Sequence, residues 1–154
     1  MADTAHTIAR AKVSQLSLQE QARGFSHKYH IDYTDVNTGT GSSDTETMTL
    51  GTLPAIYVVN GALLYITTAF AGTTTFSVVV GTTTTTNAFI AAVSVKTAAA
   101  VGGTPTTAAI VTATASKSMV AVFTNATGGS PSALTAGACD IYLNIIDMSA
   151  PTLG

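Results

Sequence analysis

Alternation of apolar and polar positions is the clearest pattern in the chain, and it begins near residue 27. In "HKYHIDYT" (27–34) every second residue is bulky or apolar, and "ETMTLGTLP" (46–54) resumes the alternation after a loop rich in Gly, Ser and Thr. A period of two is typical of a β-strand with one buried face. We therefore expect a strand in each segment, separated by a loop.

The longest apolar run, "AIYVVNGALLYITTAF" (55–70), carries an Asn-Gly pair at positions 60 and 61. Such a pair forms either a two-residue hairpin turn or a bulge within one strand. We favour one long strand with a bulge, because the two halves of the run are short.

Further apolar segments follow at short intervals between turns. Four of them predict strands: 76–82, 107–116, 118–127 and 138–148. The second and third of these are expected to pair antiparallel, with a turn at Ser116–Ser118. The Ala-rich segment 88–95 fits a strand or a short helix. Residues 96–107, which include two adjacent glycines and a proline, are interpreted as a connection.

Seven to nine short strands without helical periods predict an all-β fold. An antiparallel two-sheet β-sandwich is the simplest arrangement, of jelly-roll or Greek-key type; the absence of tryptophan and of paired cysteines argues against an immunoglobulin domain. The 154 residues suffice for one core. We divide the chain into an extended N-terminal arm (1–26), the sandwich domain (27–149) and a C-terminal tail (150–154).

Threonine is unusually abundant, with 29 residues of this type, and only 9% of residues are charged. Because Thr is β-branched and suited to a half-buried pleated surface, it favours strands over helices. The run "GTTTTTN" (81–87) is expected to join two strands at one end of the sandwich as a stiff, uncharged tip. The run is either a loop that tolerates sequence changes or a contact surface made of hydroxyl and methyl groups.

The few charges are unevenly distributed. A net charge of -2 excludes a general attraction to nucleic acid or anionic membranes, and no apolar run is long enough to cross a bilayer. We expect the single cysteine, Cys139, to be a buried core residue. A chain without a possible internal disulfide also fits a protein made in a reducing cytoplasm. Four of the six basic residues lie in the first 28 positions, and we take them as candidates for docking on an acidic protein surface: Arg10, Lys12, Arg23 and Lys28.

No motif for catalysis or cofactor binding is present in the sequence. His27 and His30 should point to opposite faces of a strand, which disfavours a shared metal ion. Asp35, Asp44 and Glu46 offer hard oxygen ligands for Ca²⁺, but without EF-hand spacing. We therefore expect no enzymatic activity, no metal and no cofactor.

Residues 29–96 suggest a family. A Leu-Pro turn is followed by an apolar strand ending in "TTAFAG", then by "FSVVVGT" and "NAFIAA". This succession resembles small virion structural proteins of tailed bacteriophages. The resemblance implies a capsid decoration (cement) protein on the outer surface of the virion, which binds the major capsid protein and forms a homo-oligomer, with a trimer favoured.

A second hypothesis is a module of a head or tail fibre that binds a host receptor or glycan. Such a module needs exposed aromatic rings on which a sugar can stack. Tyr57, Tyr65 and Tyr142 are the candidates for this role.

Overall fold

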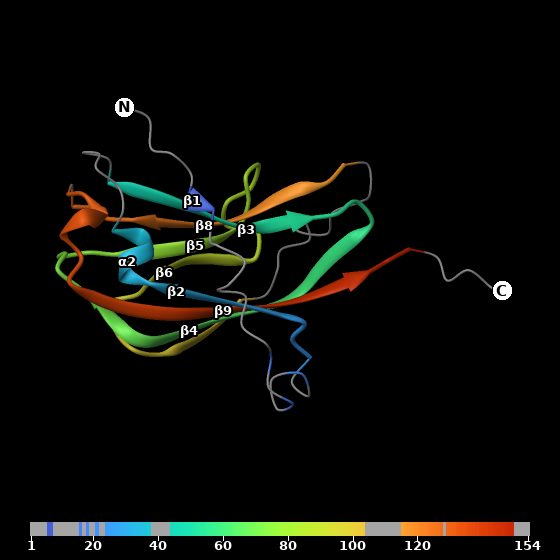
Figure 1. The fold of residues 1–154 in the computed structure, drawn as a ribbon, viewed down its shortest axis with the longest axis horizontal. Helices are drawn as coiled ribbons and strands as arrows, with labels where there is room; N and C mark the ends of the chain where they lie inside the picture. The colour runs from blue at the N-terminus through green and yellow to red at the C-terminus, as the bar shows by residue number, and fades with distance from the viewer. Residues whose placement is uncertain are drawn as a thin grey trace.

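The two alternating segments near residues 27 and 46 form strands of different sheets, and the computed structural model is a sandwich of these sheets (Figure 1). The structure describes residues 6–7, 16, 18, 21, 24–37, 44–103, 115–127 and 129–149. Sheet A contains, in spatial order, β1 (His6–Thr7), β3 (Thr45–Leu53), β8 (Lys117–Thr124), β5 (Ser77–Thr82) and β6 (Ile90–Ser94). Sheet B contains β2 (His27–Asp32), β9 (Ala136–Asp147), β4 (Tyr57–Ala71) and β7 (Ala100–Gly103).

The predicted antiparallel sandwich is confirmed. Every pairing within the described strands is antiparallel except the two-residue pairing of β1 with β3, which is parallel. Among those strands, only β5 and β6 are both consecutive in the chain and paired with each other. The chain therefore crosses between the sheets at the other connections from β2 to β9, and sheet neighbours come from distant parts of the sequence.

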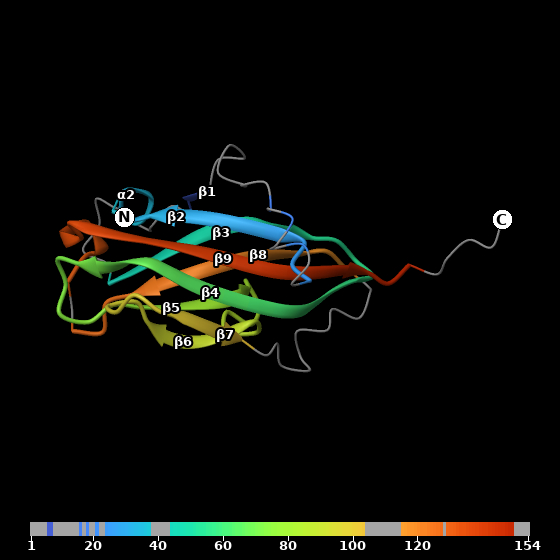
Figure 2. The same cartoon turned by 90° about the horizontal axis from the view of Figure 1, so that it is seen from below.

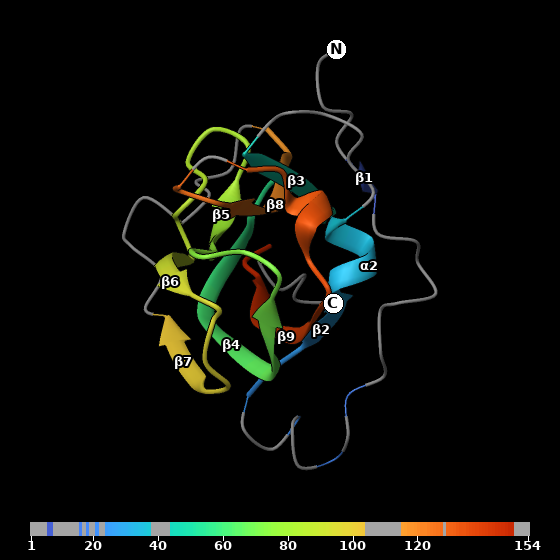
Figure 3. The ribbon, with the colours of Figure 1, turned by 90° about the vertical axis from the view of Figure 1, so that its left-hand side faces the viewer.

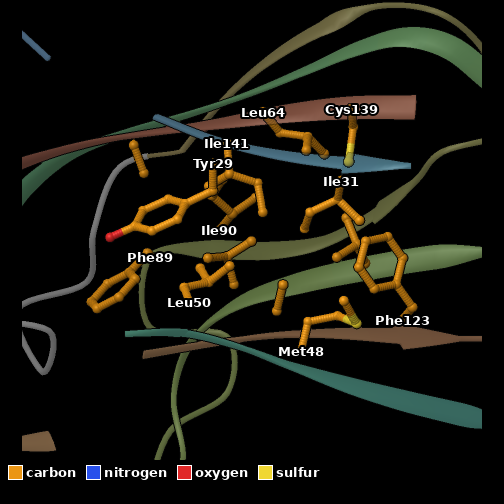
Figure 4. Close-up of a cluster of buried hydrophobic side chains, with 14 of the residues drawn as sticks. Tyr29, Ile31, Met48, Leu50, Leu64, Phe89, Ile90, Phe123, Cys139 and Ile141 are labelled. Carbon is orange, nitrogen blue, oxygen red and sulfur yellow. The ribbon is translucent and has the colours of Figure 1, made fainter. Parts of the chain in front are cut away.

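The core lies between the two sheets and follows the alternation of the strands (Figure 4). Tyr29 and Ile31 of β2 point inward from sheet B, and Met48 and Leu50 of β3 point inward from sheet A. Cys139 is buried among them, as predicted. Toward one end of the core, three aromatic rings pack with centroids 5.6 to 5.8 Å apart: Phe70, Phe76 and Phe123.

Several details of the strand prediction are confirmed. The 55–70 run forms the single strand β4, and its register with β9 shifts between Val59 and Gly61, so the Asn-Gly pair is a bulge. The ambiguous Ala-rich segment forms β6, which is a strand. The core-facing positions of β3 alternate as the sequence indicated.

One strand boundary was wrong, and one strand was missed. The first strand ends at Asp32 and not at residue 34, because the Asp32 backbone N–H donates to the Asp35 carboxylate at 2.9 Å and the chain turns into α2 (Tyr33–Val36). The segment interpreted as a connection contains β7, whose Ala and Gly residues have weak strand preference. Pairing with Ala62–Tyr65 of β4 stabilises that strand.

The hairpin predicted across Ser116–Ser118 was also wrong. β8 forms as expected, but β3 pairs along one of its edges and β5 along the other. No edge of β8 is left for a hairpin partner along Met119–Thr124. Residues 107–114 lie outside the described part of the chain.

The threonine run joins β5 to β6, as predicted, and forms a tight turn held by two backbone hydrogen bonds. The Thr82 N–H donates to the Thr85 carbonyl at 2.9 Å, and the Thr85 N–H donates back to the Thr82 carbonyl at 3.1 Å. Gly81 precedes this turn at a point where a Cβ would lie 2.3 Å from the Thr85 carbonyl oxygen. The turn therefore requires glycine at this position, while Thr83 and Thr84 remain exposed.

Short helical turns lie at one end of the sandwich, which Figure 3 shows end-on. α2 follows β2, and a 3₁₀ turn, η3 (Pro131–Ala133), precedes β9. In the part of the chain that the structure describes, no helix has the length and apolar character needed to span a membrane. The division into arm, domain and tail stays a prediction, although β1, within the predicted arm, pairs with β3.

Candidate functional site

A group of polar and charged side chains covers the outer face of sheet B. The alternation that buries Tyr29 and Ile31 turns the other residues of β2 outward. The register places His30 opposite Asp140 of β9 and Lys28 opposite Tyr142. We call the resulting set of five residues the β2–β9 cluster: Lys28, His30, Asp32, Asp140 and Tyr142.

The β2–β9 cluster is closely connected around Asp140. His30 bonds through Nδ1 to Asp140 Oδ1 at 2.6 Å and through Nε2 to Asp32 Oδ1 at 3.3 Å. The Lys28 ammonium lies 3.5 Å from the second oxygen of Asp140 and 5.2 Å from the centre of the Tyr142 ring. The side chains of Lys28 and Asp140 are only 19% and 10% exposed, so water screens their interaction less than on an open surface.

A second ring covers the aromatic member of the cluster. Phe25 lies with its ring centroid 5.4 Å from that of Tyr142, at an interplanar angle of 43°. Next to it, the Ser26 hydroxyl accepts from the Ile145 N–H at 2.8 Å and so ties the start of β2 to β9. The outer face of β9 is thus shielded up to this point, and Tyr142 is buried.

Histidine is the titrating centre of the cluster. The hydrogen bond to Asp140 is the largest cause that raises the pKa of His30; burial opposes it, and the charges of Asp140 and Asp32 add to the increase. When His30 is protonated, two positive and two negative side chains balance, and after deprotonation the cluster carries one net negative charge. The arrangement is a proton-binding ion-pair network that holds the edge strand β2 against β9.

The predicted contact residues have different outcomes. Lys28 belongs to the β2–β9 cluster, where its ammonium is engaged with Asp140 and Tyr142. Arg10, Lys12 and Arg23 lie outside the described residues. That these four basic residues contact a capsid stays a prediction.

Other candidate chemistry falls on separate parts of the fold. Burial raises the pKa of the Cys139 thiol far above its usual range, with smaller contributions from Asp140 and Asp32, so the thiol stays protonated. Asp35 caps α2, and Glu46 is buried on the core-facing side of β3. Within the described ranges, no three His, Cys, Asp or Glu side chains gather as metal ligands.

The two histidines point to opposite faces of β2, as predicted. The His27 ring stacks with Tyr29 of the inward-facing set at a centroid distance of 6.5 Å, whereas His30 lies on the outer face. Burial lowers the pKa of His27, opposite to the shift of His30.

The three candidate tyrosines are not equivalent. Tyr142 is buried, and Tyr57 packs against the core while its hydroxyl bonds to Asp147, which raises its pKa. Tyr65 is 45% exposed on β4, directly opposite Asp140. Of the three, Tyr65 therefore offers the accessible ring.

Sequence reasoning missed most of the β2–β9 cluster. The alternation in β2 already placed Lys28, His30 and Asp32 on one face, and this was the available signal. Nothing in the sequence brought Asp140 to that face, because it lies 110 residues from His30 and pairs with it only in the folded sheet.

Comparison with known proteins gives one similar structure. No family model matches the chain, and no curated protein matches its sequence. Among solved structures, the chain is similar to the capsid of Ralstonia phage GP4, with 16% sequence identity and a TM-score of 0.47. The match covers 80% of this chain and 85% of that chain.

Proposed function

We propose that this chain is a structural virion protein without catalytic activity, which binds the outside of a bacteriophage capsid and stabilises it. In this role it is a decoration or cement protein, made in the host cytoplasm and located on the capsid surface. Its partners are the major capsid protein and its own copies, with a trimer favoured.

The strand order is the observation that carries this proposal. The orders β2-β9-β4-β7 and β3-β8-β5-β6 are those expected for an eight-stranded jelly roll made of two Greek keys, with β1 added at one edge. Jelly rolls are frequent in viral capsid proteins, and also in lectins. Because a fold can host several functions, the strand order alone does not separate these classes, and the resemblance of residues 29–96 to phage virion proteins supports the capsid class.

The sheet edges also support an assembled state. β6 ends sheet A, and β2 and β7 end sheet B. An uncovered strand edge is prone to uncontrolled association, and packing against further copies or a shell covers such an edge. A coat of repeated copies gives each edge a defined neighbour.

Co-sedimentation with phage heads that lack this protein tests the proposal. We expect the purified chain to pellet with these heads, to saturate at a fixed number of copies per head and to raise the temperature at which they open. Failure to bind such heads would overturn the capsid role.

Charge reversal tests the predicted contact residues. Arg10→Glu combined with Lys12→Glu should weaken head binding, because a basic arm on an acidic shell binds partly through opposite charge. Lys96→Glu combined with Lys117→Glu, which reverses two basic residues outside the arm and changes the net charge by the same amount, is the matched control. Equal occupancy of all three proteins would remove the arm from the interface.

A glycan-binding fibre module is the alternative, and the exposure of Tyr65 is the observation that favours it. The exposed ring and the adjacent Asp140 and His30 follow one another across β4, β9 and β2. Aromatic rings with neighbouring polar groups are typical of sites that combine stacking and hydrogen bonding. Binding on a glycan array that Tyr65→Ala abolishes, without binding to heads, would favour this alternative.

A further inference from the structure

A two-stranded ribbon extends beyond the complete part of sheet B. β2 pairs with β9 only up to Leu143, and β7 pairs with β4 only over Ala62–Tyr65. β4 and β9 stay paired with each other from Gly61↔Asn144 out to Tyr57↔Asp147. Figures 1 and 2 both show these strands running past β2 and β7 toward the C-terminus. We call residues 56–61 and 144–148 the β4–β9 ribbon.

One face of the β4–β9 ribbon is already used by the domain. Val59 is buried, and Tyr57 and Ile145 pack against the core. Alternation turns Val58 and Ile146, which pair with each other, to the opposite face. This outer face therefore carries apolar side chains that the core does not cover.

The same apolar character continues to the tip of the ribbon. Ile56 is 42% exposed and Met148 is 58% exposed. Their backbones are joined, because the Met148 N–H donates to the Ile56 carbonyl at 2.9 Å. Residues 56, 58, 146 and 148 thus form an uncharged apolar surface, which we call the ribbon face.

The backbone at the tip is held in an unfavourable conformation. Ile56 has φ of 71°, in the left-handed region, which is costly for a β-branched residue and which glycine adopts freely. An exposed isoleucine recovers little of this cost through burial within its own domain. Ile56 is the third residue of the turn from Pro54 to Tyr57, which the Tyr57 N–H closes by donating to the Pro54 carbonyl at 3.3 Å, and a positive φ at this position is typical of one class of β-turn. The turn therefore sets the strained backbone and leaves the Ile56 side chain at the exposed tip.

The chemistry of the ribbon face favours a partner with the same surface. Its inner limit is an amide pair in which Asn144 Nδ2 donates to Asn60 Oδ1 at 2.7 Å. Amides carry both donors and acceptors, so two such pairs can bond to each other, whereas a charged partner would leave its charges unpaired against the apolar side chains. A surface that matches itself is what a twofold contact between identical chains requires.

We propose that the ribbon face is a contact surface for a second copy of this chain. Two copies would bury Ile56, Val58, Ile146 and Met148 against the same residues of the partner. The choice of a second copy rests on the proposed function, in which many copies of the chain gather on one shell; being twofold, the ribbon contact is distinct from the threefold contacts of the favoured trimer and would join one trimer to the next.

Sedimentation velocity over a range of protein concentrations tests the contact on the full-length chain without capsids. The wild type should self-associate, and Ile56→Asn with Met148→Ser should raise the dissociation constant about tenfold or more, as expected when central contact residues are removed. Asn tolerates the left-handed conformation, so the variant should still fold, which near-ultraviolet circular dichroism checks. Because the surface is uncharged, added salt should not weaken association.

Tyr65→Ser is the matched control, since Tyr65 is similarly exposed on the same strand but lies outside the ribbon. It should associate as the wild type does. A wild type that stays monomeric at its highest attainable concentration would overturn the proposal, as would equal association of the wild type and the double variant.

Head binding separates this inference from the proposed function. A wild type that self-associates through the ribbon face but ignores phage heads would contradict the capsid role and leave the ribbon contact standing. A wild type that binds heads but shows no ribbon-dependent association would contradict the ribbon contact alone.

Discussion

The outer face of β9 differs in chemical character between the two halves of the strand. Over Ala138–Leu143 the strand lies between β2 and β4, and its outer side chains belong to the β2–β9 cluster. Over Asn144–Asp147 its described strand partner is β4, and the outer face carries the amide of Asn144 and the half-buried Ile146. One strand thus changes from an internally bonded charged surface to an uncharged one that ends in apolar side chains.

This difference shows what flanking strands supply. In the complete part of sheet B, the neighbouring strand brings a histidine and a lysine to Asp140, so the charges bond to one another. Along the ribbon, no third strand is paired among the described residues, although the Ser26 hydroxyl bonds to Ile145, and the ribbon packs its core-facing side chains on the domain. Within the described residues, its outer face carries no ion-pair network like that of the β2–β9 cluster.

The largest effect is expected at the beginning of β9, where backbone and core meet. Gly137 has φ of 143°, and a Cβ there would lie 2.4 Å from two ring carbons of Phe70. Gly137→Ala should lower the free energy of unfolding by about 3 kcal/mol or more, because overpacking and backbone strain add. Urea denaturation measures the change.

Gly61→Ala on the ribbon is the matched control. An added Cβ would meet Asn144 Cβ at 3.6 Å, an ordinary van der Waals distance. Although Gly61 lies in the bulge of β4, we expect a change within about 0.5 kcal/mol, because the added Cβ meets no clash and the backbone has no positive φ there. Similar losses in the two variants would mean that the start of β9 and the ribbon are equally constrained.

Asp140→Asn should give the next largest effect. The substitution removes the carboxylate that His30 and Lys28 share, and we expect a loss of about 1–2 kcal/mol in the free energy of unfolding. Asp147→Asn, at the exposed end of the ribbon, should have a clearly smaller effect in the same denaturation assay. The reverse order would show that the β2–β9 cluster does not stabilise the edge strand.

The pH dependence of stability should separate the two regions further. Since the pKa of His30 is raised in the folded state, its contribution is fully present below the unfolded value of about 6.5 and is lost as the pH rises through the folded value. We expect the wild type, relative to His30→Gln, to lose up to about 1 kcal/mol across this window, because His30 is partly exposed.

His27 shifts in the opposite direction and defines the control for this experiment. Its lowered pKa gives a contribution that is present above about 6.5 and is lost as the pH falls through the folded value. Both proteins contain His27, so it cancels in the difference between their urea midpoints at each pH. A difference that does not vary with pH would show that His30 titrates as it does in the unfolded chain.

The smallest effect is expected at the ribbon tip and has the opposite sign. Ile56→Gly relieves the left-handed strain and should raise the free energy of unfolding of the monomer by about 0.5 kcal/mol. Val58→Gly, two residues along and without a positive φ, should instead lower it by about 1 kcal/mol. Thermal unfolding at low protein concentration distinguishes the two results.

Much of the local structure was predictable from the residues themselves. The alternation in 27–32 and 46–50 identified the core-facing side chains, and the Asn-Gly pair within one apolar run indicated the bulge of β4. β7 was missed because Ala100–Gly103 has weak strand preference and forms a strand through its pairing with β4. The end of β2 at Asp32 was missed because a side-chain bond from Asp35 decides it.

The candidate site was predictable only in part. The charge of Lys28 makes it a candidate contact residue, but no sequence pattern joins it to Asp140 and Tyr142. The exposure of Ile56 and Met148 could not be predicted either, because in a sequence an exposed apolar residue at a strand end cannot be distinguished from a core residue.

The fold class and the inward or outward direction of most strand residues follow from the residue pattern, because a period of two is a local property of the chain. Which strands are neighbours is visible only in the folded sheets, which bring His30 to Asp140 and leave the ribbon face without a flanking paired strand among the described residues. Sheet hydrogen bonds join segments far apart in the chain, so the pattern within one strand does not identify its partner.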